Sequence, residues 1–257
     1  MNKLHGITLL ALAGLGALAG AARAEDEPGV TPYRPSVSSP AQLPLPGQLE
    51  FELGGLNSKQ DDTRRASLPY TFKLAFNEQW GVLLGGEAYV SARDESGARA
   101  NGVGDTTVVL KRAFLVDSAT AFGLELGAKL ATAKDTIGSG RRDYSVNGIF
   151  SRDLGNVHMD ANLNLTRLGD YEADSGRTQT GLSTSFSVPV SEQWGLTGEL
   201  SGTRRRGADS TAQVLVAATY SPTKRLAIDF GVARGLTSAS PDWSVFSGFV
   251  VPLARLW

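Results

Sequence analysis

The feature that most constrains this chain is an alternation of apolar and polar side chains that recurs along most of the sequence. In one segment, Met159, Ala161 and Leu163 alternate with Asp160 and Asn162. Because successive side chains of a β-strand point to opposite faces, such a segment has one apolar face and one polar face. The alternation therefore predicts an all-β chain built from two-faced strands.

We predict twelve such strands. Most are near the roughly 9–11 residues that a tilted membrane-crossing strand needs, whereas soluble strands average about 5–6 residues. The predicted ranges are 48–57, 67–77, 80–91, 104–115, 120–131, 142–152, 157–168, 177–188, 194–205, 211–221, 225–235 and 243–256. A soluble sandwich also alternates, but its polar face carries frequent charge, and here Gly, Ser, Thr and Asn dominate the polar faces. We therefore predict one antiparallel up-and-down transmembrane β-barrel of about 12 strands over residues 48–257.

The predicted connections alternate in length. Those after even-numbered strands are brief, as at Glu78-Gln79 and Gly155-Asn156, whereas most of those after odd-numbered strands are longer and rich in Asp, Arg, Ser and Gly. In transmembrane barrels short turns face the periplasm and longer loops face outside. With an even number of strands, both ends of the chain are expected on the periplasmic side.

Tryptophan placement agrees with this orientation. Trp80, Trp194, Trp243 and Trp257 fall at the ends of predicted strands, where the two aromatic girdles of such barrels lie. The last strand ends on an aromatic residue, which resembles the terminal signal that barrel-assembly machinery recognises. We therefore expect these four residues at the membrane interfaces and the assembly machinery as a partner of the last strand.

The first 24 residues have the pattern of a cleaved export signal. Lys3 precedes an apolar run over residues 7–20, and Ala22-Arg23-Ala24 forms a small-residue cleavage site. The rival interpretation, a membrane-anchoring helix, needs about 20 apolar residues. Export and the barrel pattern together predict a place in the outer membrane of a Gram-negative cell.

Composition excludes several other classes of protein. The chain has 25 basic and 26 acidic residues, and loss of Lys3 and Arg23 with the signal leaves a net charge of −3. Nucleic-acid binding needs a strongly basic face instead. The absence of cysteine excludes a lipoprotein anchor, disulfides and thiolate metal sites.

Residues 25–47 differ from the rest of the chain because they contain six prolines. Proline at this density blocks both helix and strand ladder, so we expect an extended segment. Two interpretations stay open. The segment is either a leader in the periplasm or a plug folded into the barrel lumen.

The polar faces of the predicted strands carry charged side chains that we expect to line the lumen. They are Glu50, Glu52, Lys73, Glu87, Lys111, Glu125, Lys129, His158, Asp160, Glu199 and Asp229. Such charges either form a structural network or line a water-filled path that biases which solutes cross. Seven acids against three lysines would give such a path a modest preference for cations.

Arginines are frequent in the predicted outer loops, at positions 64, 65, 93, 99, 141, 142, 177 and 204–206. Guanidinium groups bind phosphate well, and the outer leaflet of this membrane is rich in phosphorylated glycolipid. We therefore expect glycolipid contacts from Arg141, Arg142, Arg204, Arg205 and Arg206. The alternative is plain solvated loop charge.

Catalysis has little support in the sequence. His158 is the only histidine after the predicted signal, and its place near the periplasmic end of a strand fits neither an outer-membrane phospholipase nor an omptin-like protease. We expect it to hydrogen-bond near Asp160 or Asn162. No segment has the spacing of a calcium loop. We therefore predict no enzymatic activity, no cofactor and no metal site.

Several segments carry a family resemblance. They are TPYRPSVSSPAQLPLPGQLEFELGG, LPYTFKLAFNEQWGVLLGGEAY, GDTTVVLKRAF, DYSVNGIFSRDLG, ELSGTRRRGA and ARGLTSASPDWSVFSGF. In them the chain resembles the outer-membrane "transporter" family named for a meta-pathway of phenol degradation. The resemblance implies an outer-membrane barrel that acts as a channel for small hydrophobic or aromatic compounds, and it transfers no catalytic residues.

The number of strands limits the width of the barrel interior. Barrels of about 8 strands are filled by side chains and those of about 16–18 strands hold an open channel, so twelve strands predict an intermediate pore. We predict passive passage of small solutes through it. The alternative is a non-conducting barrel with a structural role in the envelope.

Overall fold

The computed structural model describes residues 28–257, so the predicted export signal at residues 1–24 lies outside the described part. Within that part, no helix has the length and apolar character needed to cross a membrane. The strands are β1 (Gln48–Gln60), β2 (Thr63–Ala75), β3 (Trp80–Arg93), β4 (Arg99–Gly102), β5 (Thr106–Leu115), β6 (Thr120–Leu130), β7 (Asp143–Leu154), β8 (Val157–Arg167), β9 (Thr178–Pro189), β10 (Trp194–Arg205), β11 (Ala208–Thr223), β12 (Leu226–Gly235) and β13 (Trp243–Arg255).

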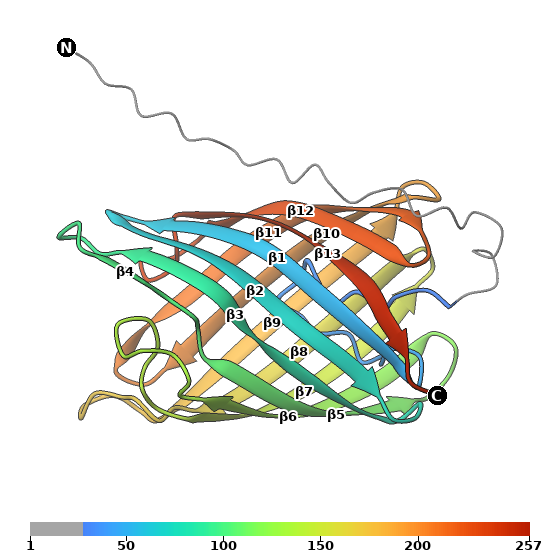
Figure 1. Cartoon of the computed structure of the whole chain (residues 1–257), viewed down its shortest axis with the longest axis horizontal. Coiled ribbons are helices and arrows are strands. Elements are labelled where there is room, and N and C mark those ends of the chain that lie inside the picture. Colours follow the sequence, from blue (N-terminus) through green and yellow to red (C-terminus); the bar gives the residue numbers. More distant parts are fainter. Residues whose placement is uncertain (1–27) are drawn as a thin grey trace, which may run out of the picture.

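These strands form one sheet that closes into a barrel (Figure 1). Neighbouring strands pair antiparallel, and β1 pairs with β13 to close the cylinder. The short β4 and the longer β5 pair with successive stretches of β3, so together they form one strand of the wall. The structure is thus a closed antiparallel 12-stranded barrel, and the predicted fold is confirmed.

The two faces of the barrel wall differ sharply in polarity. Leu163 on β8 is 50% exposed on the outside, whereas Asp160 on the same strand is buried. The largest fully buried side chains include Lys73, Lys111 and Glu50. A soluble protein rarely exposes many large apolar side chains, but a membrane barrel presents them to lipid. The outer face is therefore the lipid-facing wall of an outer-membrane barrel.

The connections differ from the prediction in two places. Residues 61–62 join β1 to β2 and residues 206–207 join β10 to β11, so both connections are two-residue hairpins rather than longer loops. Asp61 and Gly207 have positive φ angles of 49° and 69°, which tight hairpin turns of this kind use. The strands simply continue to the turn, and the longest connections join β6 to β7, β8 to β9 and β12 to β13.

The wall also contains a strand that the alternation did not predict. Arg99–Gly102, which we placed in a loop, forms β4 against the end of β3. Residues 103–105 then leave the ladder before β5 begins. The interruption matters because Asp105 lies in it and reaches the loop between β6 and β7.

Candidate functional site in the barrel interior

We call residues 28–47 the leader. Figure 1 shows this segment inside the barrel, at the end that also carries the C-terminus. Backbone hydrogen bonds hold both of its ends: Val30 N–H donates to the Lys224 carbonyl (2.9 Å) and Gly47 N–H to the Ala75 carbonyl (2.9 Å). Its prolines lack N–H donors, so the leader forms no regular ladder and the wall supplies side-chain partners instead.

Inward carboxylates from β1 and β10 accept hydrogen bonds from leader N–H groups. Glu50 accepts from Thr31 (3.1 Å), Glu52 from Tyr33 (2.8 Å), and Glu199 from Val37 (2.8 Å) and Ser38 (2.9 Å). Hydrogen bonds to a charged acceptor are stronger than neutral ones, and buried backbone donors need partners. These acids therefore bind the leader directly.

Two lysines form ion pairs with three of the buried acids of the wall. Lys73 on β2 forms ion pairs with Glu50 (2.9 Å) and Glu52 (2.6 Å), and Lys111 on β5 pairs with Glu125 (3.0 Å) on β6. Both lysine side chains are fully buried. Each ammonium also donates to a leader carbonyl, those of Thr31 and Pro40 respectively. The wall charges and the leader thus form one connected network.

The leader places an aromatic ring at the centre of this network. The Tyr33 ring centroid lies 4.4 Å from Lys73 Nζ and 4.2 Å from Lys111 Nζ, so the ring makes cation–π contacts with both lysines. The Tyr33 hydroxyl donates to the Gln42 carbonyl (2.7 Å). Burial, and then the negative charge of Glu125, raise the pKa of Tyr33 well above its ordinary value. The phenol therefore stays protonated and acts as a donor.

A second anchor fixes the leader to β12, which lies between β1 and β10 in the order of the sheet. The Arg34 guanidinium donates two hydrogen bonds to Asp229 on β12, through Nε and Nη2, both at 3.0 Å. It lies over Gly54 and Gly248, where a Cβ atom would come within 2.5 Å of the guanidinium. These two glycines leave the space that the side chain occupies. A planar guanidinium binding a carboxylate in this forked manner is geometrically specific.

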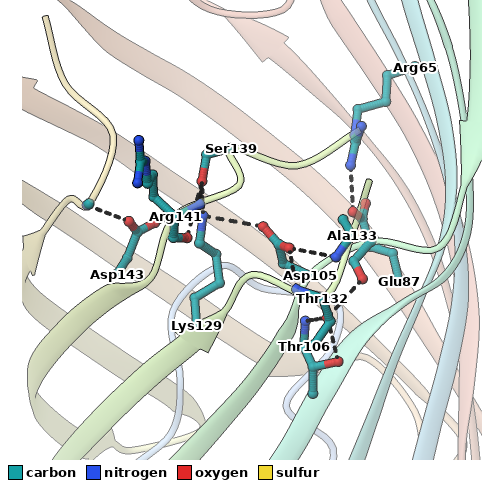
Figure 2. Close-up of polar contacts among 12 residues, drawn as sticks. Arg65, Glu87, Asp105, Thr106, Lys129, Thr132, Ala133, Ser139, Arg141 and Asp143 are labelled. Carbon is teal, nitrogen blue, oxygen red and sulfur yellow. Dashed lines mark hydrogen bonds and ion pairs between the residues drawn. The ribbon is translucent and has the colours of Figure 1, made fainter. Parts of the chain in front are cut away.

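The other end of the interior holds a separate ion-pair cluster (Figure 2). Lys129 Nζ lies 2.9 Å from Asp143 Oδ2 and 3.4 Å from Asp105 Oδ2, and Arg65 pairs with Glu87. Lys129 and Glu87, which we predicted in the same lining set as the leader-binding acids, therefore take part in a different network.

This second cluster fastens the loop between β6 and β7. Asp105 Oδ1 accepts from the N–H groups of Thr132 (3.1 Å) and Ala133 (3.0 Å), and Lys129 donates to Ser139 Oγ (2.7 Å). Figure 2 shows the loop running across these side chains. The interruption between β4 and β5 is what brings Asp105 to this position.

His158 lies away from the centre of the leader network and from the ion-pair cluster of Lys129. Its Nδ1 is 2.6 Å from Asp153 Oδ1 and its Nε2 is 3.2 Å from Asp160 Oδ1. Among the residues that the structure describes, no group of three or more His, Asp or Glu side chains is placed to hold a metal ion. Two carboxylate partners orient the imidazole as part of the wall.

Two hollows lie on either side of the leader. One, of about 490 Å³, is lined by Ser36 and Ser38 together with His158. The other, of about 460 Å³, is lined by Val37 and Ser39 and by hydroxyl and amide side chains of the wall. Because alternate leader residues face the two hollows, the leader lies between them.

The arginines predicted to contact glycolipid do not form one site. Arg141 and Arg142 are exposed in the loop between β6 and β7, but Arg204 and Arg205 lie in β10 rather than in a loop. Arg204 is exposed and Arg205 is half-buried, while Arg206 lies in the hairpin. Arg204 and Arg205 thus lie within the predicted strand 194–205, and only Arg141, Arg142 and Arg206 of the five lie in connections.

The four tryptophans lie at element ends. Trp80 begins β3, Trp194 begins β10 and Trp243 begins β13, while Trp257 ends the chain and is 59% exposed. Trp194 stacks against Tyr220 on β11, with ring centroids 4.8 Å apart. Aromatic side chains at strand ends are typical of membrane interfaces, and the girdle role of these residues stays a prediction.

Sequence reasoning missed the leader residues that bind the wall. Tyr33 and Arg34 lie in a segment without periodicity, so no face could be assigned to them. One signal was present: the predicted lining set held seven acids and three lysines, and an unbalanced buried set needs a further cation. Arg34, paired with Asp229, supplies one.

Comparison with known proteins places this geometry in context. The sequence model of a family described as "Putative MetA-pathway of phenol degradation" matches residues 33–253. The COG4313 outer membrane channel from Pseudomonas putida F1 is similar in structure, with a TM-score of 0.64, 15% identity, and 82% of this chain and 97% of that chain covered. No curated protein matches the sequence.

Two porins share the architecture as well. The NanC porin has a TM-score of 0.58 at 8% identity, covering 80% of this chain and 100% of that chain. The KdgM porin has a TM-score of 0.56 at 11% identity, covering 79% and 99%. At such low identity these likenesses concern the fold.

Proposed function

The chain belongs to the family described as "Putative MetA-pathway of phenol degradation", and from that premise we propose that it is an outer-membrane channel for the passive passage of small solutes. The observation that carries the proposal is the pair of hollows, about 490 and 460 Å³, inside a barrel whose wall turns polar side chains inward. A polar lumen is what water and small solutes need. We assign the protein no catalytic role.

The leader is the barrier in this channel. It lies between the two hollows and is held by ion pairs and hydrogen bonds to several strands. In this proposal, solutes pass from one hollow to the other when the leader shifts. The same observation supports a second candidate function, in which the docked leader makes the barrel a non-conducting envelope component.

Planar-bilayer recording separates the two functions. We compare the full chain with a variant that lacks residues 28–43, which keeps the backbone bonds of Gly47 and Gln48. A channel blocked by its leader gives larger discrete current steps after the deletion. Silence from the deletion variant, shown to be folded by its heat-dependent gel mobility, would support the non-conducting barrel.

The deletion also tests ion preference. Removing the leader removes Arg34 and leaves Asp229 and Glu199 without their leader partners. The lumen then carries an excess of acids, so the reversal potential in a salt gradient should shift toward cation selectivity. An unchanged or anion-selective potential would show that these acids do not face the conducting path.

We propose small aromatic compounds such as phenols as a solute class, since the family description refers to phenol degradation. The hollow of about 460 Å³ offers hydroxyl and amide groups, from Asn147, Asn162, Ser183 and Ser201, that can bond a phenolic hydroxyl. Phenol added to the leader-deleted channel should reduce the open-channel current, whereas glycerol at the same concentration should not. Equal effects would count against an aromatic preference.

We further propose that β13, together with the aromatic Trp257 that follows it, is the segment that the barrel-assembly machinery binds. The exposed Trp257 at the end of the chain supports this. Replacing Trp257 by Ala should slow insertion into vesicles only when the machinery is present.

A further inference from the structure

A row of cations crosses the outside of the barrel at the end opposite the leader. In the register of the sheet, Lys59 on β1 lies directly opposite Arg64 on β2. Arg64 lies opposite Arg93 on β3, and Arg93 lies opposite Arg99 on β4. Paired residues of neighbouring strands lie on the same face of a sheet. The four side chains therefore form one continuous row across four strands, which we call the cationic row.

The cationic row faces outward. Arg65, the neighbour of Arg64 in β2, pairs with Glu87 in the interior, and successive residues of a strand point to opposite sides. Arg64, Arg93 and Arg99 are all exposed. Along the sheet the row continues through Trp243, which is paired with Lys59.

The row has no counter-charge of its own. Within the described residues, the side chains of Lys59, Arg64, Arg93 and Arg99 make no ion pair and no hydrogen bond, whereas the inward cations Arg34, Lys73, Lys111 and Lys129 all do. Like charges placed directly opposite one another destabilise a sheet. Four of them in register need an anion from outside the chain.

Asp94, the acid next to Arg93 in the sequence, does not fill this role. Asp94, in the turn that follows Arg93, accepts hydrogen bonds from Ser96 Oγ (2.7 Å) and Ala98 N–H (2.9 Å) within its own turn. Those bonds, the one from Ser96 first, lower the pKa of Asp94. Its carboxylate is thus charged and already engaged.

The structure also provides space for an anion. A hollow of about 210 Å³ is lined by Arg64, Arg93 and Arg99 and by the small polar side chains of Asn57 and Ser91. Guanidinium groups bind phosphate oxygens through paired N–H donors, so three of them around one hollow match a phosphate group.

The position of the cationic row on the barrel indicates which molecule carries that phosphate. On the same outer face, further along the strands, lie apolar side chains such as Leu84 and Val245, which face lipid. Trp243 beside the row is of the kind found at membrane interfaces. Because strands tilt in a barrel, residues that face one another on successive strands lie at successive depths of the headgroup region.

We propose that the cationic row binds the phosphate groups of an anionic glycolipid in the outer leaflet. Arg64, Arg93 and Arg99 are among the arginines that the sequence placed in outer loops, and the structure places them with Lys59 in one outward row. This site is independent of whether the barrel conducts, because the row lies on the lipid side of the wall.

Thermal unfolding of the full chain in detergent tests the proposal. The midpoint is measured with bisphosphorylated lipid A, with dephosphorylated lipid A, and with inorganic phosphate. Phosphorylated lipid A should raise the midpoint clearly, and the other two additions should leave it near the detergent value. The triple variant R64Q/R93Q/R99Q should lose most of the rise. The control R152Q, which alters an exposed arginine on β7 at the leader end of the barrel, should keep it.

Several results would overturn the proposal. A triple variant that responds as the wild type does would show that other groups bind the lipid. An equal rise with inorganic phosphate would indicate a free-anion site, and an equal rise with dephosphorylated lipid A would indicate that acyl chains alone stabilise the barrel. If the triple variant does not fold, the wild-type comparison of the two lipids and the single variant R93Q still decide.

Discussion

The two ends of the barrel interior hold ion pairs of the same kind in different surroundings. At the leader end, the side chains of Lys73 and Glu50 are fully buried. At the loop end, the side chains of Lys129 and Arg65 are 24% and 37% exposed. Water can stabilise a charge that loses its partner at the loop end but not at the leader end. Equivalent substitutions should therefore have very different effects.

The largest effect is expected for Lys73→Met. The substitution leaves Glu50 and Glu52 buried beside each other without their cation and also removes a bond to the leader. Removing one partner of a buried pair costs about 3–5 kcal/mol. The free energy of unfolding, measured by denaturant titration in lipid vesicles, should fall by that amount.

A second substitution identifies the cause of that loss. If uncompensated charge is responsible, adding Glu52→Gln to Lys73→Met should restore part of the stability, because one buried acid is then neutral. A double variant no more stable than Lys73→Met would place the loss in packing around the lysine stem instead.

A smaller effect is expected for Gly54→Ala, with Gly55→Ala as its matched control. A Cβ at Gly54 would come within 2.5 Å of the Arg34 guanidinium, while one at Gly55 meets nothing within 4 Å. Arg34 must shift and weaken its bonds to Asp229, which should cost about 1–2 kcal/mol. The control should stay within about 0.5 kcal/mol of wild type.

Limited proteolysis gives a second readout for the same pair. Loosening the Arg34 anchor should make the leader of Gly54→Ala easier to cleave than that of Gly55→Ala. Equal cleavage of the two variants, together with equal stability, would show that Arg34 does not hold the leader in place.

The wall could be predicted from the sequence, because the property that defines it is local. Alternation assigns each residue of a strand to one face without knowledge of its partners. It placed Glu50, Lys73 and Asp229 on the polar face, where the structure buries them. The hairpins at residues 61–62 and 206–207 were missed because strand ends near a tight turn are polar on both faces.

The contacts of the leader and the cationic row could not be predicted in this way. Arg34 binds Asp229, 195 residues away, and nothing in a proline-rich segment indicates which wall residue it will meet. The cationic row depends on register across β1 to β4, and β4 itself lies where the alternation indicated a loop. The Arg34 contact joins segments far apart in the sequence, and the cationic row depends on a hairpin register that alternation alone does not specify.

The smallest effect is expected for Lys129→Met at the loop end. Lys129 pairs with Asp105 and Asp143, as Lys73 pairs with two glutamates, but here Asp143 is 16% exposed and Asp105 keeps the hydrogen bonds from Thr132 and Ala133 once the lysine is gone. The loss in the free energy of unfolding should stay below about 1 kcal/mol and shrink further at high salt, since exposed pairs are screened. If the loss instead matched that of Lys73→Met and did not depend on salt, burial would not be what distinguishes the two ends, and the loop between β6 and β7 would exclude water as fully as the leader does.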